Sequence, residues 1–179
     1  MTWGIPTKYK TVQFRSRLEA KWAALFDLLE WEWEYEPIDA KGYIPDFWIT
    51  PLKCFAEVKP LTDYTDGEYQ EAAVKLREAG IKGRAIILGS VARDSPGALW
   101  CGLASDGDSC WYDFQILRCT SCRAFSTSMA KGQPCWRCDQ IGPWPEQNET
   151  LKTLWIKAGN TVQWRPHRAS SFGGTKQRR

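Results

Sequence analysis

Histidine is almost absent from this chain of 179 residues, which has a single one, His167. This scarcity excludes metal sites built from several histidines, including helical zinc sites with two histidines one turn apart. A histidine-assisted nucleophile could draw only on His167, near the end of the sequence. We therefore expect the chemistry to depend on carboxylates and a lysine.

Long apolar runs are missing too. No segment approaches the roughly 18 uninterrupted apolar residues of a membrane span, and residues 1–6 lack the apolar core of a signal peptide. We expect no membrane contact and a cytoplasmic location, which would be the host cytoplasm for a phage-encoded protein. In that reducing setting the seven cysteines are expected to be free or metal-bound.

The net charge is only +3, because 24 Lys and Arg residues face 21 Asp and Glu residues. The two signs are unevenly placed, however. Residues 1–114 hold 13 basic and 18 acidic residues, a sum of −5, and residues 115–179 hold 11 and 3, a sum of +8. This asymmetry predicts an anion-binding C-terminal part beside an acidic N-terminal part. The alternative is a solvated tail, since five of those basic residues lie in the last fifteen.

Hydrophobic periodicity predicts an α/β fold whose elements follow the order αβββαβ over the first ninety residues. Helical spacing of apolar residues predicts helices over 15–30, 69–79 and 146–158. Alternating or continuous apolar patterns predict strands over 31–36, 43–50, 53–59, 84–89, 98–104 and 110–114. The strands over 43–50 and 53–59 are expected to form a hairpin. The alternating Glu32, Glu34 and Glu36 are interpreted as a solvated strand face.

An acidic group with a lysine lies within this predicted hairpin. Pro45-Asp46 stands in one strand and Glu57-Val58-Lys59 ends the other. A two-residue turn between the strands would place Asp46 opposite Glu57, with Lys59 on the same face. Two adjacent carboxylates repel each other unless a cation relieves the repulsion. Mg²⁺ or Mn²⁺, held by Asp46, Glu57 and the Val58 carbonyl, is the expected cation.

These residues resemble the signature of the PD-(D/E)XK nuclease superfamily. The resemblance covers roughly residues 14–90 and rests on Phe14-Arg-Ser-Arg-Leu-Glu19, Tyr43-Ile-Pro-Asp46-Phe47 and Glu57-Val-Lys59. It implies a restriction-endonuclease-like core and cleavage of nucleic acid to 5′-phosphate and 3′-hydroxyl ends. The implied catalytic residues are Glu19, Asp46, Glu57 and Lys59, with Glu19 joining Asp46, Glu57 and Val58 at the catalytic metal. Gln70 and Lys75, on the following helix, are weaker candidates.

Within that superfamily, the order of motifs is similar to phage and archaeal Holliday-junction resolvases and to transposon-end-cleaving endonuclease subunits. It is also similar to small phage nucleases that carry a four-cysteine zinc module. The resemblance implies DNA as the partner, branched or mobile-element DNA as the substrate, and either a homodimer or a partner protein in a recombination or transposition complex. Two alternatives stay open: an ordinary hairpin in which Lys59 neutralises two surface acids, and a pseudo-nuclease that binds DNA without cutting it.

Four cysteines follow the paired C-x-x-C spacing of a structural zinc site: Cys119, Cys122, Cys135 and Cys138. Cys54, Cys101 and Cys110 show no such pattern and are expected to be small buried side chains. The module resembles zinc ribbons, which commonly bind nucleic acid. Its candidate phosphate contacts are Arg118, Arg123, Lys131 and Arg137. Trp136 could stack on a base or pack the module against the core.

The predicted organisation is a nuclease core over 1–114, a zinc ribbon over 115–142, a helix over 143–164 and a basic flexible tail over 165–179. The leading hypothesis is a DNA endonuclease that uses Mg²⁺ or Mn²⁺ for catalysis and Zn²⁺ for structure. The alternatives are a non-catalytic zinc-ribbon protein that binds nucleic acid or acts as an adaptor, and a nuclease subunit that is inert without its partner.

Overall fold

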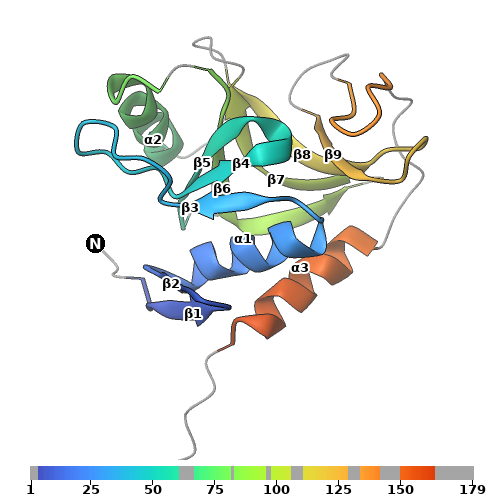
Figure 1. The fold of residues 1–179 in the computed structure, drawn as a ribbon, viewed down its shortest axis with the longest axis horizontal. Helices are drawn as coiled ribbons and strands as arrows, with labels where there is room; N and C mark the ends of the chain where they lie inside the picture. The colour runs from blue at the N-terminus through green and yellow to red at the C-terminus, as the bar shows by residue number, and fades with distance from the viewer. Residues whose placement is uncertain are drawn as a thin grey trace, which may run out of the picture.

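The structure is a computed structural model that describes residues 4–60, 67–81, 83–95, 98–105, 111–128, 134–141 and 150–163. Several predictions fall outside these residues: Lys131, Cys110, His167 and the basic tail over 165–179. Within the described parts, the chain forms a two-stranded hairpin, a seven-stranded mixed sheet and α-helices on both faces of that sheet (Figure 1). The prediction of a mixed α/β fold is confirmed.

The elements have the following bounds. The strands are β1 Thr7–Tyr9, β2 Val12–Phe14, β3 Trp33–Tyr35, β4 Phe47–Ile49, β5 Cys54–Val58, β6 Ala85–Ser95, β7 Ala98–Ser105, β8 Tyr112–Arg118 and β9 Phe125–Ser128. The helices are α1 Arg17–Leu28, α2 Gly67–Glu78 and α3 Thr150–Thr161, and a 3₁₀ turn, η1, spans Thr50–Leu52. None of the described helices is long and apolar enough to cross a membrane.

The large sheet has the strand order β3-β4-β5-β6-β7-β8-β9. Strands β5 and β6 are parallel and α2 connects them, whereas the other described pairs are antiparallel. The order αβββαβ is therefore present from α1 to β6. The hairpin of β1 and β2 and the last strand, β9, were not predicted. Because β9 pairs with β8, the sheet continues into the residues expected to form the zinc module.

Two apolar clusters hold the layers together. The larger one packs α1 and α3 against one face of the sheet (Figure 1). Trp22 and Phe26 of α1 are fully buried in it. The smaller one packs α2 on the opposite face, through Tyr69, Ala72 and Leu76. Successive side chains of a strand point to opposite faces, so β6 contributes to both layers, with Ile86 and Leu88 in the larger cluster and Ala85 and Ile87 in the smaller one. The prediction of buried, free thiols at Cys54 and Cys101 is confirmed.

The sheet is curled so that its two edges approach each other. Trp31, two residues before β3, donates its indole N–H to the carbonyl oxygen of Phe125 in β9, over 3.2 Å. Trp136, which lies between two of the four cysteines, donates to the same carbonyl over 2.6 Å. The four-cysteine segment is thereby attached to β9 and, through the shared carbonyl of Phe125, to the start of β3. The acidic residues described next lie near the other end of β3.

Candidate functional site

The acidic group lies where β4 begins and β5 ends. Phe47 pairs with Ala56 across these strands, and one further step of this register places Asp46 opposite Glu57. This is the predicted register. The connection between the strands is longer than predicted, because it contains η1 followed by Lys53 in the left-handed region, at φ 49°. Both connections have an even number of residues, so both give the same pairing.

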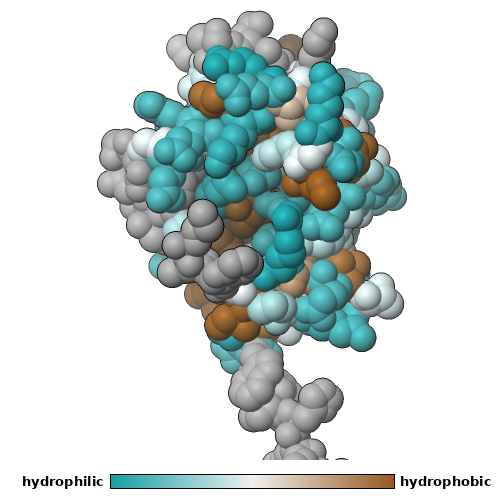
Figure 2. Space-filling view, turned by 90° about the vertical axis from the view of Figure 1, so that its left-hand side faces the viewer, coloured by the Kyte–Doolittle hydropathy of each residue, from teal (hydrophilic) through white to brown (hydrophobic). Residues whose placement is uncertain are grey.

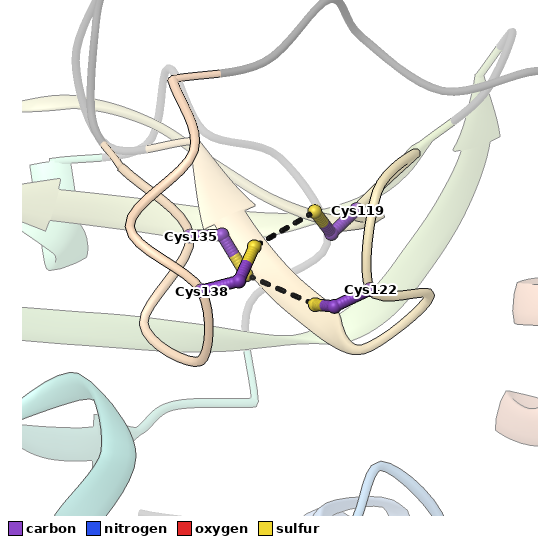
Figure 3. A group of neighbouring side chains, drawn as sticks. All are labelled: Cys119, Cys122, Cys135 and Cys138. Carbon is purple, nitrogen blue, oxygen red and sulfur yellow. Dashed lines mark hydrogen bonds between the residues drawn. The ribbon is translucent and has the colours of Figure 1, made fainter.

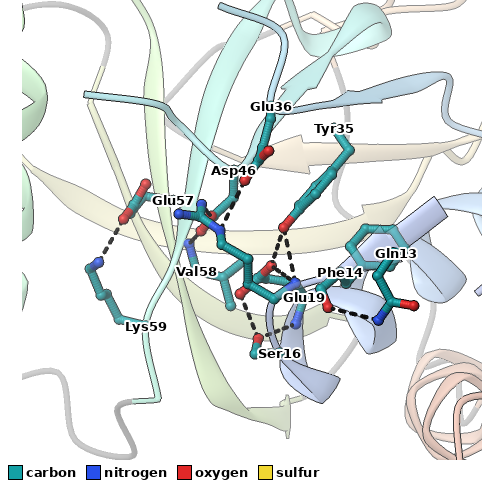
Figure 4. A network of polar contacts seen from close by, with 11 residues as sticks. Gln13, Phe14, Ser16, Glu19, Tyr35, Glu36, Asp46, Glu57, Val58 and Lys59 are labelled. Carbon is teal, nitrogen blue, oxygen red and sulfur yellow. Dashed lines mark hydrogen bonds and ion pairs between the residues drawn. The ribbon is translucent and has the colours of Figure 1, made fainter. Parts of the chain in front are cut away.

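The acidic side chains come from separate elements that meet at one end of the sheet (Figure 4). Glu19 lies in the first turn of α1, Asp46 just before β4, and Glu57 within β5. All three are buried, with 7%, 4% and 6% of their surface exposed, respectively. Lys59, just after β5, leaves 31% of its side chain exposed. The fold therefore brings together the four residues predicted to be catalytic.

Asp46 is bound on both oxygens. Its Oδ2 accepts from the backbone N–H of Val58 and its Oδ1 accepts from Arg15 Nη2, each over 2.7 Å. Burial raises the pKa of Asp46, and the charges of Glu57 and Glu19 raise it further, to about 8. The Val58 N–H and Arg15 offset only part of this rise. Burial and the neighbouring carboxylates thus outweigh Arg15, and a further cation beside Asp46 would favour its ionised form.

Glu57 is bound on one oxygen only. Its Oε1 accepts from Lys59 Nζ over 2.6 Å, while its Oε2 is buried without a hydrogen-bond partner among the described residues. The buried hydroxyl of Tyr43 makes no hydrogen bond of regular geometry among the described residues, but it faces Glu57: burial, the charge of Glu57 and a side-chain interaction with Glu57 raise the pKa of Tyr43. A buried carboxylate oxygen without a partner is costly. Asp46 and Glu57 together therefore fit a hard divalent cation, which binds carboxylate oxygens.

Glu19, in contrast, has all its oxygens satisfied. Its Oε1 accepts from Ser16 Oγ, and its Oε2 accepts from the Tyr35 hydroxyl, each over 2.6 Å. The backbone N–H of Arg15 also donates to Oε2, over 3.2 Å. Ser16 is the N-cap of α1 and its Oγ accepts in turn from the Glu19 N–H, so the two residues form a variant of the capping box. Glu19 is thus better suited to fixing the helix start than to binding a cation.

Arg15 is the important residue of this site that the sequence analysis missed. Besides its contact with Asp46, its Nε lies 2.9 Å from Oε1 of Glu36. Glu36 is thus an ion-pair partner, in contrast to the interpretation of Glu32, Glu34 and Glu36 as a solvated row. Arg15 stands in the quoted motif at Phe14–Glu19, but its partners lie up to 31 residues away. Only the folded chain identifies them.

Gln70 and Lys75 are not among the contacts of the acidic residues. Gln70 lies on the side of α2, where it lines a cavity of about 650 Å³ together with Arg77 and Trp111. Lys75 is exposed on the same helix. Figure 2 shows the side of the molecule to which α2 and the N-terminal hairpin belong, and the described residues there form a mainly hydrophilic surface with small apolar areas.

The four predicted zinc ligands converge at the end of β8 (Figure 3). Their sulfur atoms all lie within 4.8 Å of one another, and the Sγ atoms of Cys119 and Cys138 and of Cys122 and Cys135 are 3.7 Å apart. Four sulfurs around Zn²⁺ at about 2.3 Å would be separated by roughly 3.8 Å. These four cysteines could therefore hold a metal ion such as zinc.

Two similar backbone turns present these thiols. The carbonyl of Cys119 accepts from the N–H of Arg123, and the carbonyl of Cys135 accepts from that of Asp139. Arg123 and Asp139 both have positive φ, 64° and 56°. Burial alone would raise the pKa of Cys119, but backbone N–H groups of its own turn lower it to about 7. The pKa of Cys135 is raised by burial and by neighbouring thiols, and neighbouring thiols also raise that of Cys138, so the four thiols do not lose their protons independently and a bound metal ion would have to displace the remaining protons.

No protein-family model matches this chain, and neither the curated proteins nor the solved structures give a match. Function is therefore inferred from the geometry of the two sites.

The basic residues around the cysteines have mixed surroundings. Arg118 donates from Nε to the carbonyl of Arg123 over 2.8 Å, and Arg137 lies 3.9 Å from Glu30, with 54% of its side chain exposed. Trp136 is half-buried against the large core and hydrogen-bonded to β9. Its position agrees with the packing alternative and leaves the arginines as the remaining described candidates for phosphate contact.

Proposed function

We propose that the protein is a Mg²⁺- or Mn²⁺-dependent DNA endonuclease with a PD-(D/E)XK site. The observation that carries this proposal is the pairing of Glu57 with Asp46 beside Lys59, with the buried Oε2 of Glu57 making no regular hydrogen bond to any residue that the structure describes. Sheet topology supports it, because the β4–β5 hairpin followed by α2 and the parallel strand β6 agrees with the core that the motifs imply.

Each residue has a role that follows from its contacts. Asp46 and Glu57, with the Val58 carbonyl, would hold the ion, which when bound stabilises negative charge on a phosphate under attack. Lys59 Nζ, 2.6 Å from Glu57, could orient a water molecule there and stabilise its deprotonated form. Glu19 would fix the start of α1. Its negative charge disfavours the ionised form of Asp46, so it would strengthen the attraction of a cation to this group.

In this proposal the four-cysteine site is structural. Four protein thiolates close the shell of a zinc ion, so no position is left for a substrate. Zinc would hold the two turns that present Arg118, Arg123 and Arg137, and these basic residues would contact DNA phosphates. A homodimer or a partner protein in a recombination or transposition complex is the proposed context, on the basis of the sequence motifs.

The test is cleavage of duplex, single-stranded, flap and four-way-junction DNA with Mg²⁺ or Mn²⁺. Glu57→Gln and Lys59→Ala should each lower the rate at least about 10²-fold, since they remove groups that act on developing charge. Glu34→Gln is the matched control, because Glu34 is an exposed acid of β3. Cleavage at the wild-type rate in both Glu57→Gln and Lys59→Ala would contradict the proposal.

A second candidate is a non-catalytic zinc protein that binds nucleic acid or serves as an adaptor. It is favoured by one observation: among the described residues, the cysteines are the group whose potential ligand atoms converge on a single point. Arg15 and Lys59 would then be permanent counter-ions of the carboxylates. Binding that weakens steeply with salt, without cleavage of any of the four substrates, would identify this alternative.

A further inference from the structure

Arg15 occupies the oxygen of Asp46 that a divalent cation would need. Oδ2 of Asp46 is committed to the Val58 N–H, and Oδ1 accepts from Arg15 Nη2 at 2.7 Å. The Asp46 side chain is only 5% exposed, whereas that of Arg15 is 57% exposed. Asp46 is therefore fixed within the fold, while the guanidinium reaches it from the solvent side.

The backbone of Arg15 is held independently of its guanidinium. Its N–H donates to Oε2 of Glu19 and to the hydroxyl of Tyr35, over 3.2 and 3.1 Å. Loss of the contact with Asp46 would leave these two hydrogen bonds in place. The side chain can thus change partner without unfolding the start of α1.

The guanidinium also has donors to spare. An arginine carries five N–H donors in a planar fork that matches phosphate oxygens. Among the described residues, Nη2 contacts Asp46 and Nε contacts Glu36, and the Arg15 side chain also interacts with the Tyr35 hydroxyl. A phosphate brought to Asp46 and Glu57 would meet the exposed side of this fork.

We propose that Arg15 is an exchangeable cation: it neutralises Asp46 until a divalent metal ion binds there, and its guanidinium then binds a phosphate of the nucleic acid. This inference rests on the proposed function and specifies how its site is regulated. Each charged group keeps a partner of opposite sign, because the metal ion replaces the guanidinium on the carboxylate and the guanidinium gains the phosphate; the one positive charge that the site gains on balance is offset by Glu57, which also contacts the metal ion. Nucleic acid would then bind productively only after the metal ion.

The first measurement is Mn²⁺ binding without nucleic acid, by isothermal titration calorimetry. Arg15→Gln should bind Mn²⁺ about tenfold more tightly than Arg17→Gln. Arg17 is an exposed arginine two residues away, so this control removes the same charge without removing a contact to Asp46. Arg15→Lys keeps a competing cation and should stay near the wild type. Equal Mn²⁺ affinities in Arg15→Gln and Arg17→Gln would overturn the proposal.

The second measurement is the affinity for a short DNA duplex, in Ca²⁺ and in EDTA, at several salt concentrations. In Ca²⁺ the Arg15→Gln variant should bind more weakly, and the slope of log affinity against log salt should be shallower by about 0.9, the value for one lost phosphate contact. In EDTA the slopes should agree. A merely structural role would leave the slope in Ca²⁺ unchanged, and that result would also overturn the proposal.

These readouts separate the two proposals, because neither depends on cleavage. If the wild type cuts none of the DNA substrates but Arg15→Gln shows both shifts, the endonuclease proposal fails and the exchange stands. If the wild type cuts DNA and both shifts are absent, the exchange fails and the endonuclease proposal stands. Thermal unfolding of Arg15→Gln and Arg15→Lys would verify that both variants are folded.

Discussion

At the scale of single residues, three buried carboxylates differ in what stabilises them. Glu19 is satisfied by hydroxyl and backbone donors, Asp46 by one N–H and an exposed guanidinium, and Glu57 by Lys59 on one oxygen only. Buried charges persist in proteins when they are paired or bind metal. An added cation would therefore stabilise Glu57 most, Asp46 less and Glu19 least. Substitutions should affect the proposed binding of a divalent ion in the same order.

Asp46 should make stability depend on pH. Its pKa in the fold is raised to about 8, so between about pH 4 and pH 8 the folded state binds more protons than the unfolded state. Its contribution to the free energy of unfolding is complete below about pH 4 and is lost as pH rises toward 8. Urea unfolding without added divalent ions should show this decline, and Asp46→Asn should remove it. Identical pH profiles for the two proteins would contradict the assignment.

Gly102 in β7 should not tolerate a side chain. A Cβ there would lie 2.0 Å from the carbonyl oxygen of Ile87 in the neighbouring strand, next to a bulge in the pairing of β7 with β8. Gly102→Ala should lower the free energy of unfolding by about 2–4 kcal/mol, because backbone would have to move. Gly67→Ala is the control: none of the described residues has an atom within 4 Å of a Cβ at Gly67, so chemical denaturation should show little change or a small gain.

At the scale of elements, β9 links the four-cysteine segment to the strand β3. The carbonyl of Phe125 accepts from both Trp31 and Trp136, so one acceptor joins the two edges of the curled sheet. This link relates the cysteine turns to Tyr35 at the end of β3, whose hydroxyl binds Glu19.

Trp136→Phe tests this link, since it removes the indole N–H while keeping an aromatic side chain. The variant should lose about 0.5–1.5 kcal/mol of stability, the usual value of one hydrogen bond. Hydrogen exchange, followed by mass spectrometry, should accelerate in β9 and around Trp31 but not in α2, which packs on the opposite face. Uniform acceleration over the whole chain would show that Trp136 supports the core in general and is not a specific link.

The elements were predictable from sequence where an apolar repeat extended over several turns. The pairing of two strands was predictable where it depended only on whether their connection had an even or an odd number of residues. The apolar spacing of α1 and α2 spans several turns, and the pairing of Asp46 with Glu57 survived a wrong turn length because an even connection preserves the face. The hairpin of β1 and β2 has strands of three residues, too short for a periodic signal. Strand β9 consists mostly of Ser and Thr and so gives no apolar pattern, although its Ser126 and Thr127 are buried.

The site was predictable only in part, for a related reason. Motif order identified Glu19, Asp46, Glu57 and Lys59, whose side chains do meet at one end of the sheet. The roles of Arg15 and of the Trp31 contact depend on partners far away in the sequence. No local pattern encodes such contacts, because they form only in the folded chain.

At the scale of the whole molecule, the four cysteines that could hold a metal ion and the proposed site at Asp46 and Glu57 share one sheet. Thiolates at the end of β8 suit a soft-ligand ion such as zinc, whereas the oxygens of Asp46 and Glu57 suit a hard ion. The ligand types keep the sites from exchanging ions readily. The curled sheet nevertheless connects them mechanically, through β9, Trp31 and β3.

This connection predicts an asymmetric response to the loss of zinc. Cys138→Ser removes one of four converging ligands, so the variant should contain less than one zinc ion per chain and unfold at a lower temperature. Hydrogen exchange should rise first in β9, then at Trp31 and β3, while α2 and β6, joined by a separate apolar cluster, stay protected. Added Mn²⁺ should not restore protection in β9, because Mn²⁺ prefers oxygen ligands. Full protection in the zinc-depleted variant would show that the cysteines contribute nothing to the sheet; equal loss in α2 would show that the two layers unfold as one unit.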